Sequence, residues 1–391
     1  MNIEQKATEY YDYMIGLRRH FHAHPEVSRE EYQTAQRIRQ ELDNMGIEWR
    51  PCGFETGTLA VIHGAKPGRT ILLRGDMDAL SVQEETGLPF SSENEGIMHA
   101  CGHDCHTATL LTAARILNDV KDALCGTVKL AFQPAEEVAE GALAMIEQGA
   151  LEGVDGCFGI HVMPDIEAGK VSITSGPRMS AADVLFIDIA GKGGHASTPH
   201  LCVDAVTVTS AIVTNLQSIV SREIDPFKPA VLTIGKMEAG TRSNAVAEYG
   251  KLEGTVRYYD SELGSVFKEA VERIVTNTAN AFRAKVNVRY LPVMPPTIND
   301  PAVTEIALRA GIKALGADAV IQTPPVTSSE DFAFYMQKVP GVFAFVGVKD
   351  KDCDTVWSLH SGKFSPVESA LINSVKMYVQ MAVEFNAQSE E

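Results

Sequence analysis

Residues 98–106 read MHACGHDCH and gather metal-binding side chains into nine consecutive positions. Thiolate, imidazole and carboxylate groups are the common ligands of zinc and its first-row neighbours, so a metal site is the first hypothesis. Because so tight a cluster cannot direct every side chain at one point, some of its members must have other roles. We expect Cys105 to pack at the start of a helix, and His99 and His106 to support the ligands rather than to bind metal.

The cluster alone is compatible with two other chemistries. Two cysteines and two histidines could form a closed structural zinc site. Cys101 and Cys105 could instead form a thiol redox pair. A catalytic metal site is favoured by further ligand types that lie far along the chain. These residues are Glu136, Glu137, His161 and His360.

The Glu136–Glu137 pair follows an apolar segment and the dipeptide Gln133-Pro134. Adjacent carboxylates most often lie on a solvated face of a protein. At the end of a buried strand, however, they are costly unless a cation or a proton neutralises one of them. The pair is therefore interpreted as part of the metal site.

The elements that must position these side chains are expected to alternate between strand and helix over the first 180 residues. Amphipathic patterns predict helices at 3–23, 29–45 and 107–119, the second ending at Gly46. Apolar segments predict strands within 58–64, 69–80, 127–137 and 156–164. This alternation is typical of a mostly parallel sheet with helices on both faces.

In such sheets, binding and catalytic residues gather at the carboxyl ends of the strands. One predicted strand runs into Asp76 and Asp78, which are two positions apart, so their side chains point to one side of an extended chain. Glu136, Glu137 and His161 fall near the ends of the next predicted strands. Separate segments of the chain are therefore expected to bring these polar residues to one edge of the sheet.

Residues 181–296 show a different order of expected elements, strand, helix, strand, strand, helix, strand. That order predicts a ferredoxin-like antiparallel sheet with helices on one face. We therefore predict an α/β fold, in which a mostly parallel-sheet catalytic domain is formed by residues 1–180 and 297–391. Residues 181–296 would be an inserted ferredoxin-like βαββαβ domain that serves as a lid or a dimerisation domain.

The composition restricts the classes of function. The chain has 391 residues and a net charge of −17, which repels phosphate backbones and anionic membranes, so neither nucleic acid nor a membrane is an expected partner. The N-terminus lacks the pattern of a secretory signal, and the seven scattered cysteines do not form a disulfide framework. A cytoplasmic protein with reduced thiols is expected.

The charge is unevenly divided along the sequence. Residues 181–296 contain 12 basic and 12 acidic residues, so the whole net charge of −17 lies on the remainder of the chain. An acidic domain suits the loading of cations, and a neutral one suits the binding of an anionic substrate.

Eight stretches of the chain resemble the M20 metallopeptidase and amidohydrolase family. The similarity is to the branch of N-acyl-amino-acid amidohydrolases, which includes hippurate hydrolases, auxin-conjugate hydrolases and N-acetyl-diaminopimelate deacetylases. The stretches follow the family's order from about residue 18 to 366 and so cover nearly the whole chain. They are RRHFHAHPEVSREE, RGDMDAL, MHACGHDCHTA, FQPAEE, GIHVMP, GKGGHASTPH, SSEDFAFY and LHSGKFSP.

The resemblance implies two divalent metal ions per subunit, zinc, manganese, cobalt or nickel, with Cys101 as the bridging thiolate. The implied ligands are Cys101, His103, Glu137, His161 and His360. Glu136 resembles the general base. Other branches have a His-x-Asp pair where this chain has Asp76-Met77-Asp78. We therefore expect Asp78 to orient the ligands and do not expect Asp76 to bind metal.

Substrate-binding residues are expected in the inserted domain. His195 resembles a histidine that reaches the active site from the small domain, often of the partner subunit, and can donate to an oxyanion. Asn244 and Arg257 are expected to assist with the substrate carboxylate, which the guanidinium fork matches. The chain departs from many relatives after Asn244, where it reads AVAEY instead of a Val-Ile-Pro run. A structural role of His195 in its glycine-rich turn and an ordinary ion pair of Arg257 are the alternatives.

Together, these inferences predict a metal-dependent hydrolase that cleaves the amide bond of small N-acyl amino acids. Metal-activated hydroxide would attack the amide, with Glu136 as general base. A homodimer or a higher homo-oligomer is expected. A dipeptidase with the same two-metal site is one alternative, and a non-catalytic binding or regulatory protein with the same fold is another.

Overall fold

The computed structural model describes residues 2–351 and 356–387, and the chain divides into two compact units. The larger unit is formed by Met1–Gly176, Ile298–Pro324 and Asp331–Glu391. The smaller unit is formed by Pro177–Thr297 and Pro325–Glu330. That the larger unit is catalytic and the smaller one a lid or dimerisation domain stays a prediction.

The larger unit contains an eight-stranded sheet in the order β1-β2-β4-β3-β5-β16-β6-β15. The strands β4, β3, β5 and β16 are adjacent and parallel, whereas β1–β2, β2–β4 and β16–β6 are antiparallel pairs. The predicted mostly parallel sheet is confirmed. The strands are β1 (Glu48–Pro51), β2 (Thr58–His63), β3 (Lys66–Asp76), β4 (Cys125–Gln133), β5 (Gly156–Glu167), β6 (Val171–Ser172), β15 (Val320–Ile321) and β16 (Gly341–Lys349).

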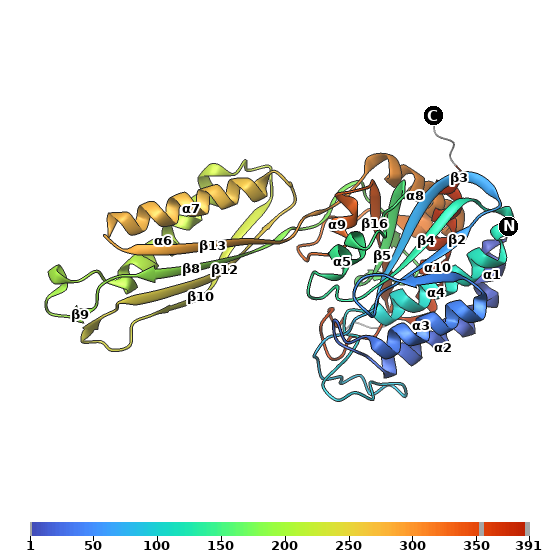
Figure 1. Cartoon of the computed structure of the whole chain (residues 1–391), viewed down its shortest axis with the longest axis horizontal. Helices are drawn as coiled ribbons and strands as arrows, with labels where there is room; N and C mark the ends of the chain where they lie inside the picture. Colours follow the sequence, from blue (N-terminus) through green and yellow to red (C-terminus); the bar gives the residue numbers. More distant parts are fainter. Residues whose placement is uncertain (1, 352–355, 388–391) are drawn as a thin grey trace. The chain divides into compact units, whose positions relative to one another are not determined.

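Helices cover both faces of this sheet (Figure 1). Side chains alternate between the two faces of a strand. Leu73 of β3 and Phe158 of β5 pack in the main core with α4 and α10, while Phe343 of β16 points the other way and contacts Phe332 beside α9. The helices are α1 (Ile3–Glu9), α2 (Tyr11–Ala23), α3 (Tyr32–Met45), α4 (His103–Asp119), α5 (Gly141–Glu147), α8 (Pro301–Leu315), α9 (Ala333–Met336) and α10 (Leu371–Asn386).

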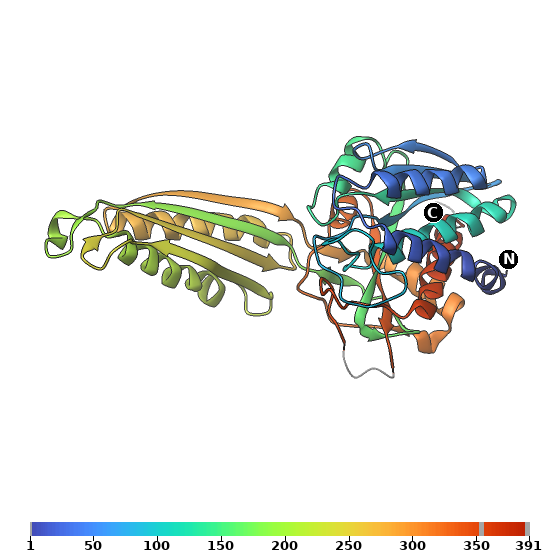
Figure 2. The same cartoon turned by 90° about the horizontal axis from the view of Figure 1, so that it is seen from below.

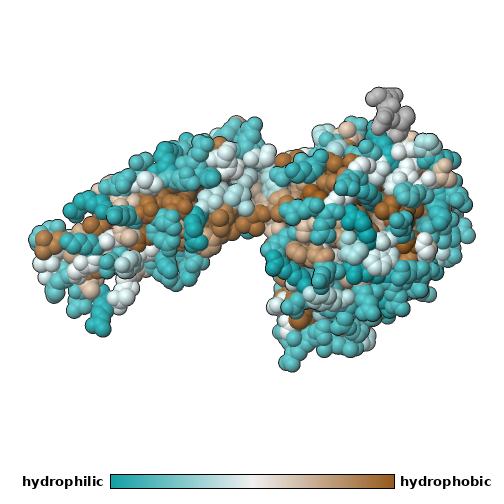
Figure 3. All heavy atoms as spheres, viewed as in Figure 1, coloured by the Kyte–Doolittle hydropathy of each residue, from teal (hydrophilic) through white to brown (hydrophobic). Residues whose placement is uncertain are grey.

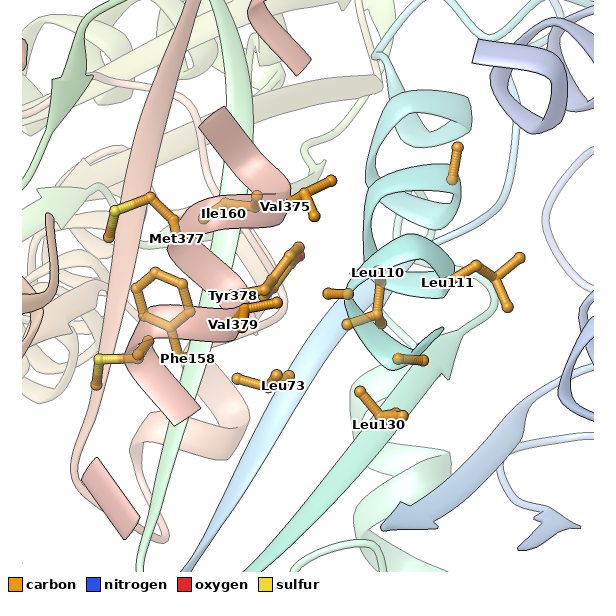
Figure 4. Close-up of a cluster of buried hydrophobic side chains, with 14 of the residues drawn as sticks. Leu73, Leu110, Leu111, Leu130, Phe158, Ile160, Val375, Met377, Tyr378 and Val379 are labelled. Atoms are coloured by element: carbon orange, nitrogen blue, oxygen red, sulfur yellow. The ribbon is translucent and has the colours of Figure 1, made fainter. Parts of the chain in front are cut away.

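The main core lies between the sheet and the helices α4 and α10 (Figure 4). Leu110 of α4 and Tyr378 of α10 are both fully buried. The ring of Tyr378 meets Phe158 edge to face at 5.9 Å. Its hydroxyl group donates to the carbonyl oxygen of Arg74 at 2.6 Å, so the core also fixes β3 near the strand end that carries Asp76.

Several element boundaries differ from the sequence prediction. The helix expected at 3–23 is divided at Tyr10, which caps both α1 and α2. The helix α3 begins at Tyr32 rather than at residue 29, and it ends at the left-handed Gly46 as predicted. The strand β5 continues beyond residue 164 to Glu167, so His161 lies within the strand instead of at its end.

The smaller unit is an antiparallel four-stranded sheet in the order β10-β12-β8-β13. The helices α6 and α7 lie on one face of this sheet (Figure 2), where they enclose a separate apolar core. The inserted ferredoxin-like βαββαβ fold is therefore confirmed. Its elements are β8 (Ala182–Ala190), α6 (Ala205–Ser218), β10 (Ala230–Ala239), β12 (Tyr249–Tyr258), α7 (Leu263–Ala281) and β13 (Lys285–Met294).

Shorter elements complete the chain. In the smaller unit, β9 (Gly194–His195) pairs with β11 (Ala245–Val246). The strands β7 (Gly176–Met179) and β14 (Thr297–Asn299) lie where the chain passes from one unit to the other. On the face shown in Figure 3, each unit is largely hydrophilic with smaller apolar areas. Within the described residues, no helix has the length and apolar character needed to cross a membrane.

Candidate metal centre

Gly102 separates the expected ligands Cys101 and His103, and the backbone at this position requires glycine. Gly102 has a φ of +86°, and a Cβ atom there would lie 2.4 Å from Cγ2 of Val162. His103 is the first residue of α4. This turn brings the thiol and the imidazole into one group of potential ligand atoms with His161.

Hydrogen bonds determine which ring nitrogen of His103 and His161 carries the proton. Nδ1 of His103 lies 2.9 Å from the carbonyl oxygen of Asp78, and Nδ1 of His161 lies 2.7 Å from that of Val162. A carbonyl oxygen only accepts hydrogen bonds, so both Nδ1 atoms donate. Each ring therefore offers the lone pair of Nε2, and Nε2 of His161 is 3.4 Å from the Cys101 sulfur.

A second group of potential ligand atoms contains Cys101 again, with Glu137 and His360. The N–H group of His360 donates to the carbonyl oxygen of Ala100 at 2.9 Å, which ties the C-terminal segment to the start of the cluster. Nε2 of His360 lies 3.5 Å from Oε1 of Glu137. In each group the ligand atoms lie within 4.8 Å of one another, so Cys101 is common to two candidate metal positions.

The donor set fits divalent metal ions. Nε2 of His103 and Oε1 of Glu137 are buried and have no hydrogen-bond partner, which is costly for polar atoms inside a protein. Burial raises the pKa of the Cys101 thiol; His103 opposes this effect and Glu137 adds to it. A bound cation would stabilise the thiolate and would also use these free lone pairs.

Cys105 and His99 lie outside this donor set. Cys105 is buried in the first turn of α4 and, like Cys101, is a free thiol. His99 is buried, and burial lowers its pKa to about 4. Among residues 2–351 and 356–387, neither Cys105 nor His99 belongs to a group of potential ligands, so residues 98–106 do not form a closed Cys₂His₂ site there. Cys101 and Cys105 are both free and form no disulfide with each other.

Glu136 and Glu137 lie on a turn between β4 and α5, and their carboxylates form a further group with His103. The N–H group of Asp331 lies 3.5 Å from Oε1 of Glu136, to which it donates. Three buried carboxylates accept hydrogen bonds from N–H groups of the turn and of the start of α5. They are Glu31 with Ala135 at 2.8 Å, Asp78 with Glu137 at 3.1 Å and Asp331 with Ala142 at 3.0 Å.

Asp78 connects the turn to the ligand His103. It accepts a hydrogen bond from the Ser28 hydroxyl at 2.6 Å, and its Oδ1 lies 3.3 Å from Nδ1 of His103. Burial would raise the pKa of Asp78, but hydrogen bonds from His103, Ser28 and the Glu137 N–H group outweigh it, so the pKa is lowered. An ionised carboxylate in this place can orient metal ligands without binding metal itself.

Asp76 and His106 form a buried pair beside the candidate ligands. Asp76 makes an ion pair with Arg74, and its Oδ1 lies 2.5 Å from Nδ1 of His106. Nε2 of His106 accepts the N–H group of Val162 at 3.0 Å. Asp76, His103 and His106 are close enough to form a group of potential ligands. However, both nitrogens of His106 are already used, so its contacts hold β5 next to His161.

A buried network of charged residues anchors the start of α4. Arg18 and His22 of α2 contact the same carboxylate oxygen of Asp104, at 2.9 Å and 2.8 Å. On its other side, His22 contacts Glu84 at 3.2 Å. Glu84 also accepts the N–H group of Ser92 at 2.6 Å. The network therefore fixes Asp104, which is the neighbour of His103, against the loop that follows β3.

In the smaller unit, the three expected substrate-binding residues do not all lie together. The pairing of β9 with β11 places His195 opposite Ala245, next to Asn244. The strand β12 begins beside this pair at Tyr249, and Arg257 lies near its other end. Eight residues of strand at ~3.3 Å each separate Tyr249 from Arg257 by roughly 26 Å.

His195 is exposed and has a defined tautomer. Its Nδ1 atom accepts the N–H group of Ser197 at 3.1 Å, so the proton of the neutral ring is on Nε2. The exposed ring therefore offers an N–H donor. Arg257, at the far end of the sheet, donates to the Ser329 hydroxyl at 3.4 Å.

Residues 72–384, most of the chain, match the sequence pattern of one enzyme family. The chain belongs to peptidase family M20/M25/M40. It is a metal-dependent hydrolase of this family, and the resemblance drawn from its motifs is confirmed.

Relatives of this M20 hydrolase match it over nearly its full length. N-acetyl-L-cysteine deacetylase of Bacillus subtilis (strain 168) is 42% identical over 97% of this chain and 89% of that protein. An IAA-amino acid hydrolase of Arabidopsis thaliana is 35% identical over 97% of this chain and 87% of that protein. The crystal structure of the Bacillus subtilis YXEP protein, described as a dinuclear metal binding peptidase from the M20 family, is 33% identical. It has a TM-score of 0.84 and covers 96% of this chain and 98% of its own.

Four residues that contact or neighbour the candidate ligands have no role that the sequence pattern predicts. Ser28 and Glu31 lie in the motif RRHFHAHPEVSREE, Arg74 begins RGDMDAL and Asp331 lies in SSEDFAFY. Glu31 falls in the first turn of the helix predicted at 29–45, where an acidic residue is normally exposed. Its complete burial is the informative property, and composition and periodicity do not reveal it.

The pH dependence of stability tests the network at Glu84. Burial would raise its pKa, but hydrogen bonds from His22, the Ser92 N–H group and Thr86 lower the pKa from 4.5 to about 2. The unfolded state therefore binds the proton more readily, and the stabilisation from Glu84 is present above about pH 4.5 and is lost as the pH falls to about 2. We expect Glu84→Gln to lower the melting temperature at pH 7 and to have a much smaller effect near pH 2.5, as measured by circular dichroism.

The matched control is Glu85→Gln, because the exposed Glu85 carboxylate lies 3.6 Å from Lys363 and outside the network. Its effect should be small at both pH values. An equal decrease in the melting temperature of Glu84→Gln at both pH values would contradict the lowered pKa of Glu84.

Proposed function

We propose that this M20 hydrolase cleaves the amide bond of small N-acyl amino acids at a site that holds two divalent metal ions. The observation that carries the proposal is the pair of ligand groups that share Cys101, one with His103 and His161 and the other with Glu137 and His360. Similarity to N-acetyl-L-cysteine deacetylase and to an IAA-amino acid hydrolase supports the substrate class. Thiolate and imidazole ligands favour zinc, manganese, cobalt or nickel over magnesium or calcium.

In this proposal, Glu136 acts as general base and then as general acid. The metal ions, when bound, would supply Lewis acidity that polarises the amide carbonyl group and acidifies water. The buried Glu136 carboxylate, grouped with His103 and Glu137, can take the proton of the attacking water and pass it to the departing nitrogen. The hydrogen bond from Asp331 orients this carboxylate. Hydrolysis by this route needs no side-chain nucleophile.

The smaller unit would supply the contacts to the substrate, as a lid or dimerisation domain of residues 181–296. The Nε2–H group of His195 suits the oxygen on which negative charge develops. Asn244 lies beside it, and Arg257 offers a fork that matches the substrate carboxylate.

The separation of His195 from Arg257 supports a dimer. An N-acyl amino acid is about two or three residues long, or roughly 7–11 Å, whereas about 26 Å of strand separates the two ends of β12. One small substrate cannot contact both residues of one chain. We therefore propose that Arg257 and His195 of a complete site come from two copies of the chain in a homodimer.

Replacement of the base tests the proposed reaction. We expect Glu136→Gln to keep its metal content and to lower kcat by ~10²–10⁴-fold on acetyl- and benzoyl-amino acids, because only proton transfer is lost. Glu140→Gln, in the same turn, is the matched control and should keep normal turnover. Faster wild-type hydrolysis of dipeptides would favour a dipeptidase, and an inactive wild type would favour a binding protein. Normal turnover by Glu136→Gln would refute the base assignment.

Metal content tests the role of Cys101. We expect Cys101→Ala to hold fewer than two metal ions per chain, because both ligand groups lose a donor. Cys105→Ala, which removes a buried thiol in the next turn, should keep the wild-type stoichiometry. Plasma emission spectrometry of the dialysed protein measures the number of metal ions per chain. Full occupancy in Cys101→Ala with normal activity would exclude the bridging role.

Mixing two inactive variants tests whether His195 acts across the dimer. Chains carrying His195→Ala and chains carrying Glu136→Gln should regain about a quarter of wild-type activity after subunit exchange. Half of the dimers are then mixed, and each mixed dimer has one complete site. No recovery, with exchange verified by mass spectrometry, would place His195 in the site of its own chain.

A further inference from the structure

The turn that carries Glu136 and Glu137 contains a residue in an unfavourable conformation. Ala135 has a φ of 54°, in the left-handed region where a Cβ atom crowds the following carbonyl oxygen. Such residues persist where their surroundings impose the conformation, and they cluster at functional sites. Ala135 directly precedes the proposed base, so its conformation sets the direction in which Glu136 leaves the backbone.

The turn is closed tightly on its C-terminal side. The carbonyl oxygen of Ala135 accepts the N–H groups of Glu140 at 3.2 Å and Gly141 at 3.1 Å. A Cβ atom on Gly141 would lie 1.6 Å from the carbonyl oxygen of Pro134, so this position accepts only glycine. The closing contacts hold one side of Ala135 and leave its N–H group to be held by another residue.

Glu31 provides that contact. Its Oε1 atom accepts the Ala135 N–H group at 2.8 Å and the Arg29 N–H group at 3.0 Å, while Oε2 accepts the Thr56 hydroxyl at 2.9 Å. The carboxylate is completely buried, which is costly without hydrogen bonds.

A helix-capping role does not explain this burial. Glu31 is the N-cap residue of α3, yet its side chain makes no capping hydrogen bond to that helix. The carboxylate is instead directed at the turn of Ala135, which is distant in sequence.

We propose that Glu31 is a positioning residue for amide hydrolysis, which acts through the left-handed Ala135 to aim Glu136 at the attacking water. This inference rests on the proposed function, because it assigns Glu31 to the base of that reaction. Glu31 does not contact the substrate. Glu137 has its own support in the hydrogen bond from its N–H group to Asp78, so loss of Glu31 should affect proton transfer more than metal binding.

The central experiment compares Glu31→Met with Glu31→Gln. The methionine leaves the Ala135 N–H group without an acceptor, and we expect kcat to fall ~10–100-fold with nearly unchanged KM and metal content. The glutamine keeps an oxygen for this N–H group and should restore kcat to near the wild-type value. Thr56→Val, which removes the contact to the other carboxylate oxygen, controls for general destabilisation and should keep kcat.

A second variant tests the route through Ala135. Glycine adopts the left-handed conformation without strain and does not need Glu31 to hold it. The double variant Glu31→Met/Ala135→Gly should therefore lose much less kcat than the product of the losses in the two single variants. Losses that multiply would show that Glu31 does not act through Ala135 and would overturn the proposal.

Hydrogen exchange separates this inference from the proposed function. Exchange of the peptide covering residues 134–142 should be slow in the wild type and Glu31→Gln and faster in Glu31→Met. If the wild type hydrolyses no N-acyl amino acid, the proposed function fails, and the exchange rates alone decide whether Glu31 holds the turn. Unchanged exchange in Glu31→Met, or an active Glu31→Met enzyme with wild-type kcat, would overturn the positioning role.

Discussion

Negative charge gathered around one buried thiol is the constraint on which the larger unit depends. Four carboxylates, Asp76, Asp78, Glu136 and Glu137, lie near Cys101 or the neighbouring ligand His103. Each must be compensated, because isolated charges are not tolerated in a protein interior. The protein itself compensates Asp76 with Arg74 and His106, and Asp78 with three hydrogen-bond donors. At Cys101 and Glu137, by contrast, thiol and carboxylate atoms remain for cations. The protein's own donors thus distinguish supporting carboxylates from candidate ligands.

The backbone around this charge is fixed at unusual positions. Gly102, Ala135 and His360 all have positive φ, and each lies next to or at a candidate ligand or the proposed base. A ligand set drawn from separate loops needs such sharp changes of direction, because regular strands and helices would carry the side chains away from a common point. The contact of Glu31 with the Ala135 N–H group and that of the Ala100 carbonyl group with the His360 N–H group hold two of these conformations in place. Rigid support of this kind is what reactive geometry requires.

Local patterns in the sequence predict the fold class and a metal cluster, and the resemblance to the M20 family implies the set of ligands. The contacts that support these ligands depend on which side chains tertiary packing buries. Alternating apolar segments predicted both sheets, and the ligand types in MHACGHDCH predicted the metal cluster. The supporting role of Glu31 depends on its contact with Ala135, about a hundred positions away, which periodicity does not encode. Likewise, the separation of Arg257 from His195 follows from strand direction in the smaller sheet. His161 lies within β5 because β16, from the C-terminal part of the chain, extends the pairing of that strand.

The position of β16 has a consequence for synthesis of the chain. β16 pairs with β5 in the middle of the larger sheet, yet Gly341 is made long after Glu167, because the whole smaller unit is translated between them. At ~5–20 residues per second, β5 spends about 10–35 s on the ribosome as an unpaired edge. Exposed edges of this kind template aggregation. The nascent larger unit therefore stays incomplete and without His360 until the C-terminal part of the chain has been made. The smaller unit is formed mostly by one continuous segment and can fold earlier.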